Sequence, residues 1–169
     1  CKEFISAVKA ADPNARFAAH ANTAAYNGVQ NNNPSDWREW HRAILADSDL
    51  VNEIDYISVH AYYSHCKNEI MDQLIGFVES DINASAGANR IKIFLSEYAE
   101  SVYTYGDQTT NPHNMEGVLQ TADMLSRMTY HTGIESATYH GIYSSHWQNV
   151  VYDSATGKMQ LNAIGNLLK

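Results

Sequence analysis

The chain has 169 residues, of which 44% are apolar and 18% are charged, and this balance is typical of a globular protein with a single core. Its formal net charge of -8 argues against a nucleic-acid partner or an anionic membrane surface, because both repel an acidic protein. No apolar stretch approaches the roughly 20 residues of a membrane-spanning helix. No signal-peptide pattern is present, so the sequence leaves open a cytoplasmic or a secreted location.

Predicted helices and strands alternate along the chain, and this order is typical of a parallel sheet with helical crossovers. Asp36 and Glu39 have the spacing of a capping box at a helix start. Gly133 suits the left-handed conformation that ends many helices. In chain order, we expect a helix ending at about 11, a strand at 16–19, a helix at 36–47, a strand at 54–59, a helix at 69–85, a strand at 91–95, a helix at 115–132, a strand at 135–142, an extended piece at 149–152, a turn at 154–157 and a helix at 160–169.

Four strand–helix units make half of an eight-unit barrel or a small open sheet. A doubly wound sheet that binds a nucleotide would carry a glycine-rich turn after its first strand, and neither G-x-G-x-x-G nor a P-loop occurs. The half-barrel, an α/β fold with parallel strands, is therefore favoured. Phe4, Ile5 and Val8 have helical spacing at the very start of the chain, so we expect residues 1–169 to be a fragment of a longer protein.

Polar and aromatic residues follow the predicted strands. Glu97 comes directly after the apolar run 91–95, a place that suits a nucleophile or base, although a Glu that caps a loop or pairs with a Lys is the alternative. In a barrel the carboxyl ends of all strands face one mouth, so the residues that follow them should converge. The side chains expected at this mouth are His20, Asn22, His60, Tyr62, Glu97, Tyr98 and His140.

The sequence runs 57–62, 94–98 and 119–128 resemble the C-terminal half of the catalytic barrel of clan A retaining glycoside hydrolases, and in particular the family 51 α-L-arabinofuranosidases. The resemblance implies strands five to eight of a (β/α)8 TIM barrel and hydrolysis of polysaccharide or oligosaccharide glycosidic bonds. It also implies that Glu97, at the end of the seventh strand, is the nucleophile that forms a covalent glycosyl-enzyme. Tyr62, in the sequence His60-Ala61-Tyr62, would hold that carboxylate, and no cofactor is implied.

Retaining glycosidases need a second carboxylate about 5 to 5.5 Å from the nucleophile. The resemblance places this acid/base Glu after an Asn at the end of the fourth strand, ahead of residue 1. Asn52-Glu53 and Asn68-Glu69 imitate that dipeptide, but the first precedes a strand and the second opens a helix, where Glu suits the helix dipole. The expected partner is therefore the missing N-terminal half-barrel, and the fragment alone should be inactive.

The eighth strand has two possible registers, one with His140 at the mouth and one with residues 146–148 there. Trp147 is the expected sugar-stacking aromatic, with a core position as the alternative. His60 and His65 lie across a loop without a metal-binding spacing, so we expect no metal site. Ser96 is not in a G-x-S-x-G turn, which argues against a serine hydrolase.

Two other functions remain open at this point. One is a carbohydrate-binding or structural half-barrel without catalysis. The other is a different clan A specificity, such as a xylosidase, an agarase or an endoglycanase. A carboxylate within about 5.5 Å of Glu97 is required by a hydrolase and not by a binding module.

Overall fold

The computed structural model describes residues 2–21, 35–63, 68–85, 90–100, 104–105, 108–109, 114–141 and 148–169, with backbone alone at 35–37, 63, 100, 104–105 and 108–109. Its centre is a four-stranded sheet in the order β1-β2-β3-β6, in which all neighbouring strands are parallel. The strands are β1 (Ala18–His20), β2 (Tyr56–Tyr63), β3 (Lys92–Glu100) and β6 (Ile134–Tyr139). The predicted α/β class with a parallel sheet is confirmed.

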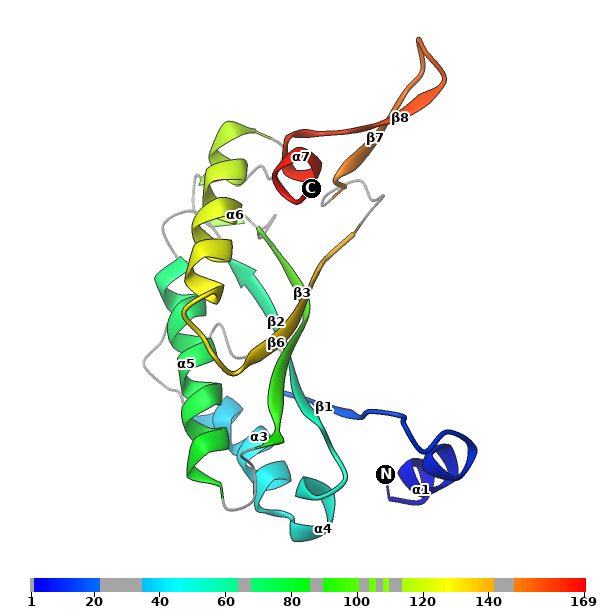
Figure 1. The fold of residues 1–169 in the computed structure, drawn as a ribbon. Coiled ribbons are helices and arrows are strands. Elements are labelled where there is room, and N and C mark those ends of the chain that lie inside the picture. The colour runs from blue at the N-terminus through cyan, green and yellow to red at the C-terminus, as the bar shows by residue number, and fades with distance from the viewer. Residues whose placement is uncertain are drawn as a thin grey trace.

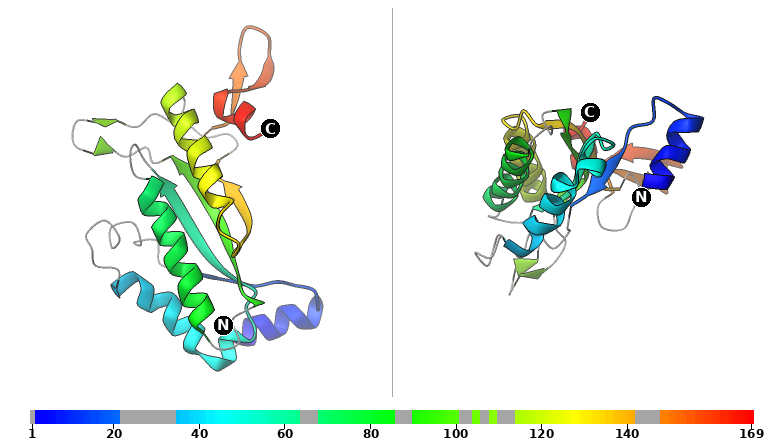
Figure 2. Two further views of the ribbon diagram at one scale, coloured as in Figure 1. Left: turned by 60° about the vertical axis from the view of Figure 1, so that its left-hand side comes forward. Right: turned by 90° about the horizontal axis from the view of Figure 1, so that it is seen from below.

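Three helices cover one face of this sheet, namely α3 (Ser35–Ala46), α5 (Asn68–Ala84) and α6 (Met115–Met128). Figures 1 and 2 show them on the same side of the strands, while α1 (Lys2–Ala11) lies away from them beyond β1. Alternate residues of a strand point to opposite faces, so every second residue of β2 and β3 packs under the helices. The core residues at this contact include Ile57, Val59, Ala61, Ile93, Leu95, Met71, Leu74, Ile75, Val78 and Met124.

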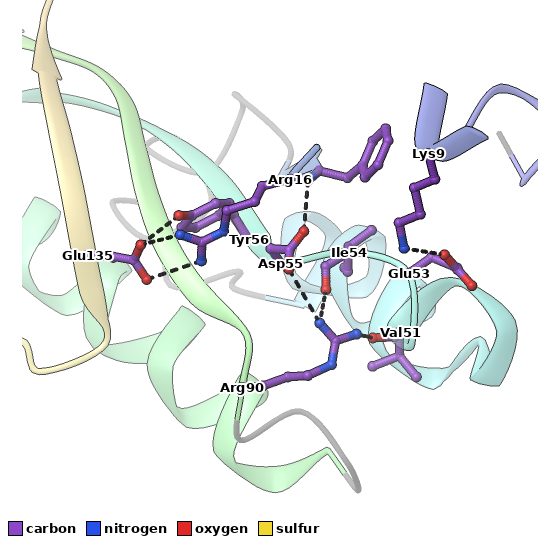
Figure 3. A network of polar contacts seen from close by, with 10 residues as sticks. Lys9, Arg16, Val51, Glu53, Ile54, Asp55, Tyr56, Arg90 and Glu135 are labelled. Atoms are coloured by element: carbon purple, nitrogen blue, oxygen red, sulfur yellow. Dashed lines mark hydrogen bonds and ion pairs between the residues drawn. The ribbon is translucent and has the colours of Figure 1, made fainter. Parts of the chain in front are cut away.

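The opposite face of the sheet is polar at its amino end (Figure 3). Arg16 Nη1 donates to Glu135 Oε1 at 2.6 Å, and the Tyr56 hydroxyl donates to the same oxygen at 2.6 Å. The Arg16 guanidinium also lies 4.3 Å from the centroid of the Tyr56 ring. The Arg16 and Glu135 side chains are about half exposed, because no helix in the described part of the chain covers this face. In a complete barrel this layer would lie inside.

The amino ends of the strands are fastened by charged side chains (Figure 3). The Asp55 carboxylate accepts from Phe17 N at 2.9 Å, and Arg90 donates to the carbonyls of Ile54 and Val51. These bonds satisfy backbone groups where the sheet begins. The Phe17–Asp55 bond links the start of β1 to that of β2, and the Arg90 bonds link the start of β3 to the residues before β2.

Several predicted boundaries are wrong in informative ways. The predicted helix 36–47 ends at Ala46, because Asp47 accepts from the N–H groups of Asp49 and Leu50 and caps a separate short helix, α4 (Ser48–Val51). The loop that was expected after residue 100 contains two paired two-residue strands, β4 (Thr104–Tyr105) and β5 (Gln108–Thr109).

The helix α6 ends at Met128, and Gly133 does not cap it. Thr129 is the C-cap residue, and the glycines with positive φ in the described residues are Gly141 and Gly157. Gly133 has another role: its N–H donates to Glu79 Oε1 at 2.6 Å, and a Cβ there would lie 2.8 Å from that oxygen. A close approach, and not a backbone conformation, accounts for the glycine.

The predicted last helix is largely wrong. Residues 150–161 form a hairpin in which β7 (Val150–Asp153) pairs antiparallel with β8 (Lys158–Leu161), with the predicted turn between them. Only α7 (Ala163–Leu167) is helical, capped by the Asn162 side chain. Ile164 is buried as predicted, but Leu161 is 42% exposed. The hairpin projects beyond the sheet (Figure 1).

No helix in the ranges described above is long and apolar enough to cross a membrane.

Candidate active site

The candidate site lies at the carboxyl edge of the parallel sheet. Both central strands run further than predicted, β2 to Tyr63 and β3 to Glu100. His60, Tyr62 and Glu97 therefore lie within strands and not in the loops that follow them. Their directions are set by strand pleating and by hydrogen bonds to a neighbouring strand, which holds them more rigidly than a loop would.

A β-bulge in β3 sets the direction of the Glu97 side chain. Val59 pairs with Leu95, but His60 pairs with Glu97, so Ser96 is one extra residue in β3. Leu95 lies in the core under the helices, and Ser96 Oγ lies 2.6 Å from Ser58 Oγ on the opposite face. Glu97 contacts His60 on that same opposite face. The bulge thus brings two consecutive side chains to one face of the sheet.

Three side chains surround the Glu97 carboxylate, and they reach the same oxygen. The Tyr62 hydroxyl donates a short hydrogen bond to Oε2, which is the contact that the sequence predicted. His60 Nδ1 lies 3.3 Å from Oε2, and His140 Nδ1 lies 3.4 Å from it. The Glu97 side chain is 32% exposed, so a ligand can still reach it.

The imidazole and phenol rings pack edge to face around this carboxylate. The Tyr62 ring centroid lies 6.3 Å from that of His60 and 5.7 Å from that of His140. His20 packs against His60 with centroids 4.5 Å apart, and its Nδ1 lies 3.3 Å from Ser58 Oγ. Burial lowers the pKa of His20, and the neighbouring His60 acts in the same direction. This imidazole is therefore neutral at pH 7.

The structure brings together five of the residues that the sequence placed at the mouth: His20, His60, Tyr62, Glu97 and His140. It brings His140 to the mouth, as expected of one of the two registers of the last strand. The N–H of His140 donates to Tyr98 O at 2.9 Å, which continues the pairing of β6 with β3 and carries the His140 ring to Glu97. Gln148, from the other register, accepts at its carbonyl from Asn162 near α7.

Tyr98 is not part of this site, which corrects the prediction. It is 5% exposed, belongs to the core cluster and packs edge-on against Tyr139 at 5.4 Å. The cause is the bulge at Ser96. Glu97 faces away from the helices, so the next residue along the strand, Tyr98, faces them. Asn22, His146 and Trp147 lie outside the described residues.

Glu53 and Glu69, which follow an Asn as the expected acid/base residue does, form ion pairs with basic side chains. Lys9 Nζ lies 2.6 Å from Glu53 Oε2, at the amino end of the sheet shown in Figure 3. Arg127 Nη2 lies 3.1 Å from Glu69 Oε1 on the helical side. The Glu100 side chain is not among those described. Among the side chains that are described, no group of three or more His, Cys, Asp or Glu could hold a metal ion.

Sequence reasoning missed the hydrogen bond between Ser58 and Ser96 and the bulge that creates it. No local signal predicts either feature. Strict alternation along β3 would place Ser96 on the face away from the helices and Glu97 on the face that the helices cover. Only the pairing of β3 with β2 reveals the extra residue.

No protein-family model matches the chain, and a search of curated protein sequences finds no significant match. Solved structures do match. One is the crystal structure of an arabinofuranosidase, with a TM-score of 0.64 and 16% identity, covering 98% of this chain and 33% of that protein. Another is the thermostable GH51 α-L-arabinofuranosidase from Thermotoga petrophila RKU-1, with a TM-score of 0.65 and 15% identity, again covering 98% of this chain and 33% of that protein.

The chain thus spans about a third of the length of these enzymes. At such low identity the likeness shows the fold alone. It confirms the expected resemblance to the family 51 arabinofuranosidases at the level of fold, and with it the expected half of a TIM barrel.

Proposed function

We propose that residues 1–169 are the C-terminal half of the TIM-barrel catalytic domain of a retaining, arabinofuranosidase-like glycoside hydrolase, and that Glu97 is its nucleophile. The observation that carries the proposal is the position of Glu97: a part-exposed carboxylate at the carboxyl edge of a parallel sheet, held at Oε2 by Tyr62. The fold likeness to two arabinofuranosidases supports it.

The arrangement suits nucleophilic catalysis. A carboxylate nucleophile must keep one rotamer and leave one oxygen accessible, and the hydroxyl of Tyr62 restricts the rotamer from the Oε2 side. The neighbouring imidazoles of His20, His60 and His140 offer further donors and acceptors for a hydroxyl-rich substrate. The substrate is then a polysaccharide or oligosaccharide with an accessible glycosidic bond.

The second carboxylate comes, in this proposal, from an N-terminal half-barrel. Among the described residues, the sheet has β1 and β6 at its two edges, and the Arg16 and Glu135 side chains on its polar face are about half exposed. Coverage of one third of the matched enzymes is consistent with a missing partner half. That half would place its acid/base Glu about 5 to 5.5 Å from Glu97, the separation typical of retaining enzymes.

The test uses the full-length protein that contains this chain and an aryl α-L-arabinofuranoside as substrate. Glu97→Ala and Glu97→Gln should lower kcat by several orders of magnitude without loss of fold, because a part-exposed carboxylate at the mouth contributes little to packing. Azide should restore turnover to Glu97→Ala by replacing the nucleophile. Glu69→Gln, the same change at a carboxylate held by Arg127, is the matched control and should keep wild-type rates.

A 2-deoxy-2-fluoro glycoside should label the wild-type protein on the peptide that contains Glu97. Full activity of Glu97→Ala, or a label on another residue, contradicts the assignment. Binding of sugar without turnover or label would instead identify a carbohydrate-binding half-barrel. Labelling together with preference for a xyloside or an endo-linked polymer would identify another clan A specificity.

A further inference from the structure

The three contacts to Glu97 come from one strand and from the residue that follows another, and all of them reach Oε2. Tyr62 and His60 belong to β2, and His140 follows β6 on the other side of β3. Each of these three contacts is to Oε2, which distinguishes this oxygen from Oε1. Oε2 is therefore the oxygen that these three side chains approach.

His140 is held in place by groups on both of its sides. Its backbone N–H donates to Tyr98 O at 2.9 Å, and its ring packs edge-on against Tyr62 at 5.7 Å. These contacts direct Nδ1 at Glu97 Oε2 across 3.4 Å. Catalytic contacts are often this long without a ligand and shorten in the substrate complex.

We infer that His140 acts on the nucleophile and not on the sugar: together with Tyr62 and His60 it holds Oε2, which leaves Oε1 as the attacking atom and assists departure of the sugar from Glu97. This inference rests on the proposed function. It assigns to the last strand of the sheet a positioning role in place of the sugar contact expected from the sequence.

The charge on Oε2 changes during the two steps of a retaining reaction. First, Oε1 bonds to the anomeric carbon while the bond from that carbon to the leaving-group oxygen breaks, and a carboxylic acid of the other half-barrel protonates that oxygen. Next, the resulting carboxylate takes a proton from water, the water oxygen bonds to the anomeric carbon, and the bond to Oε1 breaks with its electron pair returning to Glu97. Oε2 is the carbonyl oxygen of the ester between these steps.

A donor at Oε2 therefore affects the two steps differently. It stabilises the free carboxylate, from which the first step starts and which the second step releases. Loss of one donor slows the second step, because the departing carboxylate is less stabilised. The first step starts from that stabilised carboxylate, so loss of the donor does not slow it.

This difference gives His140 a kinetic signature that a sugar contact would not have. With a good aryl leaving group, kcat reports the second step and kcat/KM reports the first. His140→Ala should lower kcat by about tenfold and KM by at least as much, so that kcat/KM does not fall, since tenfold is the effect of losing about 1.4 kcal/mol. A pre-steady-state burst of about one aryl alcohol per enzyme should appear as the ester accumulates.

Two further variants complete the experiment. His140→Asn keeps a donor near the position of Nδ1 and should restore kcat and KM toward wild-type values. His140→Leu keeps the bulk of the ring and replaces His140→Ala in the assay should the smaller side chain prevent folding. The matched control is His131→Gln, because His131 contacts two carboxylates far from Glu97 and its loss should leave both kinetic constants unchanged.

The outcomes separate this inference from the proposed function. Inactivity of Glu97→Ala together with labelling of Glu97 would support the proposed function. If His140→Ala then raises KM, or lowers kcat/KM tenfold without a burst, His140 binds the sugar, and only the inference about His140 fails. If Glu97→Ala is fully active, the proposed function fails first. Parallel loss of kcat and KM with rescue by Asn establishes the positioning role.

Discussion

Ser96 and Glu97 are consecutive residues, yet both side chains lie on the same face of the sheet. The hydroxyls of Ser96 and Ser58 share a hydrogen bond, and Glu97 contacts His60. Ser58 and His60 are two residues apart in β2, so their side chains lie on the same face of the sheet. The bulge that makes this possible inserts one residue between Leu95 and Glu97. The same irregularity turns Glu97 into the mouth and Tyr98 into the core.

The first prediction concerns Gly133. Gly133→Ala should destabilise the protein by about 1–3 kcal/mol, because the new Cβ would lie 2.8 Å from Glu79 Oε1 and 2.9 Å from Glu79 Cγ. Glu79 can move away only by losing its bonds to Gly133 N and His131. Urea unfolding of the full-length protein measures the change.

Gly76→Ala is the matched control for Gly133→Ala. Gly76 lies in α5, and the nearest atom to a Cβ there is His131 Cε1 at 3.9 Å. The substitution therefore meets no obstacle and should stabilise the helix by up to about 1 kcal/mol. Equal effects of the two substitutions would refute the proposed close approach at Gly133.

The second prediction concerns Asp81, which joins α5 to α3. Its side chain is 5% exposed and accepts from Arg38 at 2.6 and 2.9 Å, from Arg42 at 2.9 Å, and contacts His41 Nε2 at 2.8 Å. Burial raises the pKa of Asp81, but the bonds from Arg38, Arg42 and His41 outweigh it and hold the pKa at about 2. Asp81→Asn should cost about 3–5 kcal/mol at pH 7, because the largely buried guanidinium of Arg38 loses its carboxylate partner.

The pH dependence of stability identifies the same residue. The folded pKa of Asp81 lies below the unfolded value of 3.8, so its contribution is present above about pH 4 and is lost as the pH falls toward 2. Urea unfolding across this window should show a steep loss for the wild type and a shallower one for Asp81→Asn. Asp49→Asn, which breaks an exposed pair with Lys2, is the control and should leave the free energy of unfolding nearly unchanged.

The third prediction concerns His131, which bridges two acidic residues on one face of α5. Its Nδ1 lies 2.8 Å from Glu79 Oε2 and its Nε2 lies 2.9 Å from Asp72 Oδ1, and only the imidazolium donates from both nitrogens. Burial lowers the pKa of His131, but these two carboxylates outweigh burial and raise it above 6.5.

The contribution of His131 is therefore present below the unfolded pKa of 6.5 and is lost as the pH rises through the higher folded value. The midpoint of thermal unfolding should fall between about pH 6 and pH 9 in the wild type. His131→Gln should flatten that slope, and Asp72→Asn should reduce it in part. An identical slope in wild type and His131→Gln would exclude the bridge as its cause.

The fourth prediction concerns the chain by itself. Residues 1–169 alone should show no glycosidase activity and should dimerise or aggregate, because within the described ranges β1 and β6 are the sheet's edge strands and the face with Arg16 and Glu135 is uncovered. Sedimentation and turnover of an aryl arabinofuranoside measure both properties. A stable, active monomer would place a second catalytic carboxylate within the chain, and Glu100 would be the first to test, since Glu53 and Glu69 are already paired.

Much of the architecture follows from local patterns. The apolar runs at 54–59 and 91–95 become the buried centres of β2 and β3, because alternation of side chains and burial under helices are properties of each segment alone. Proximity of Tyr62 to Glu97 follows from the order of parallel strands, which carry their carboxyl ends to one edge. The C-terminal hairpin was missed because residues 160–168 have apolar residues at helical spacing, while pairing of β8 with β7 outweighs that pattern.

The sequence by itself determined the alternating strands and helices, the parallel sheet and the group of polar residues at its carboxyl edge. Tertiary structure decided which side chains of that group meet. Tyr98 lies in the core, His140 contacts Glu97, and three side chains contact the same carboxylate oxygen. The physical reason is that a bulge and a register are set by hydrogen bonds to a neighbouring strand 35 or more residues away along the chain, and such pairing leaves no trace in the local period of β3.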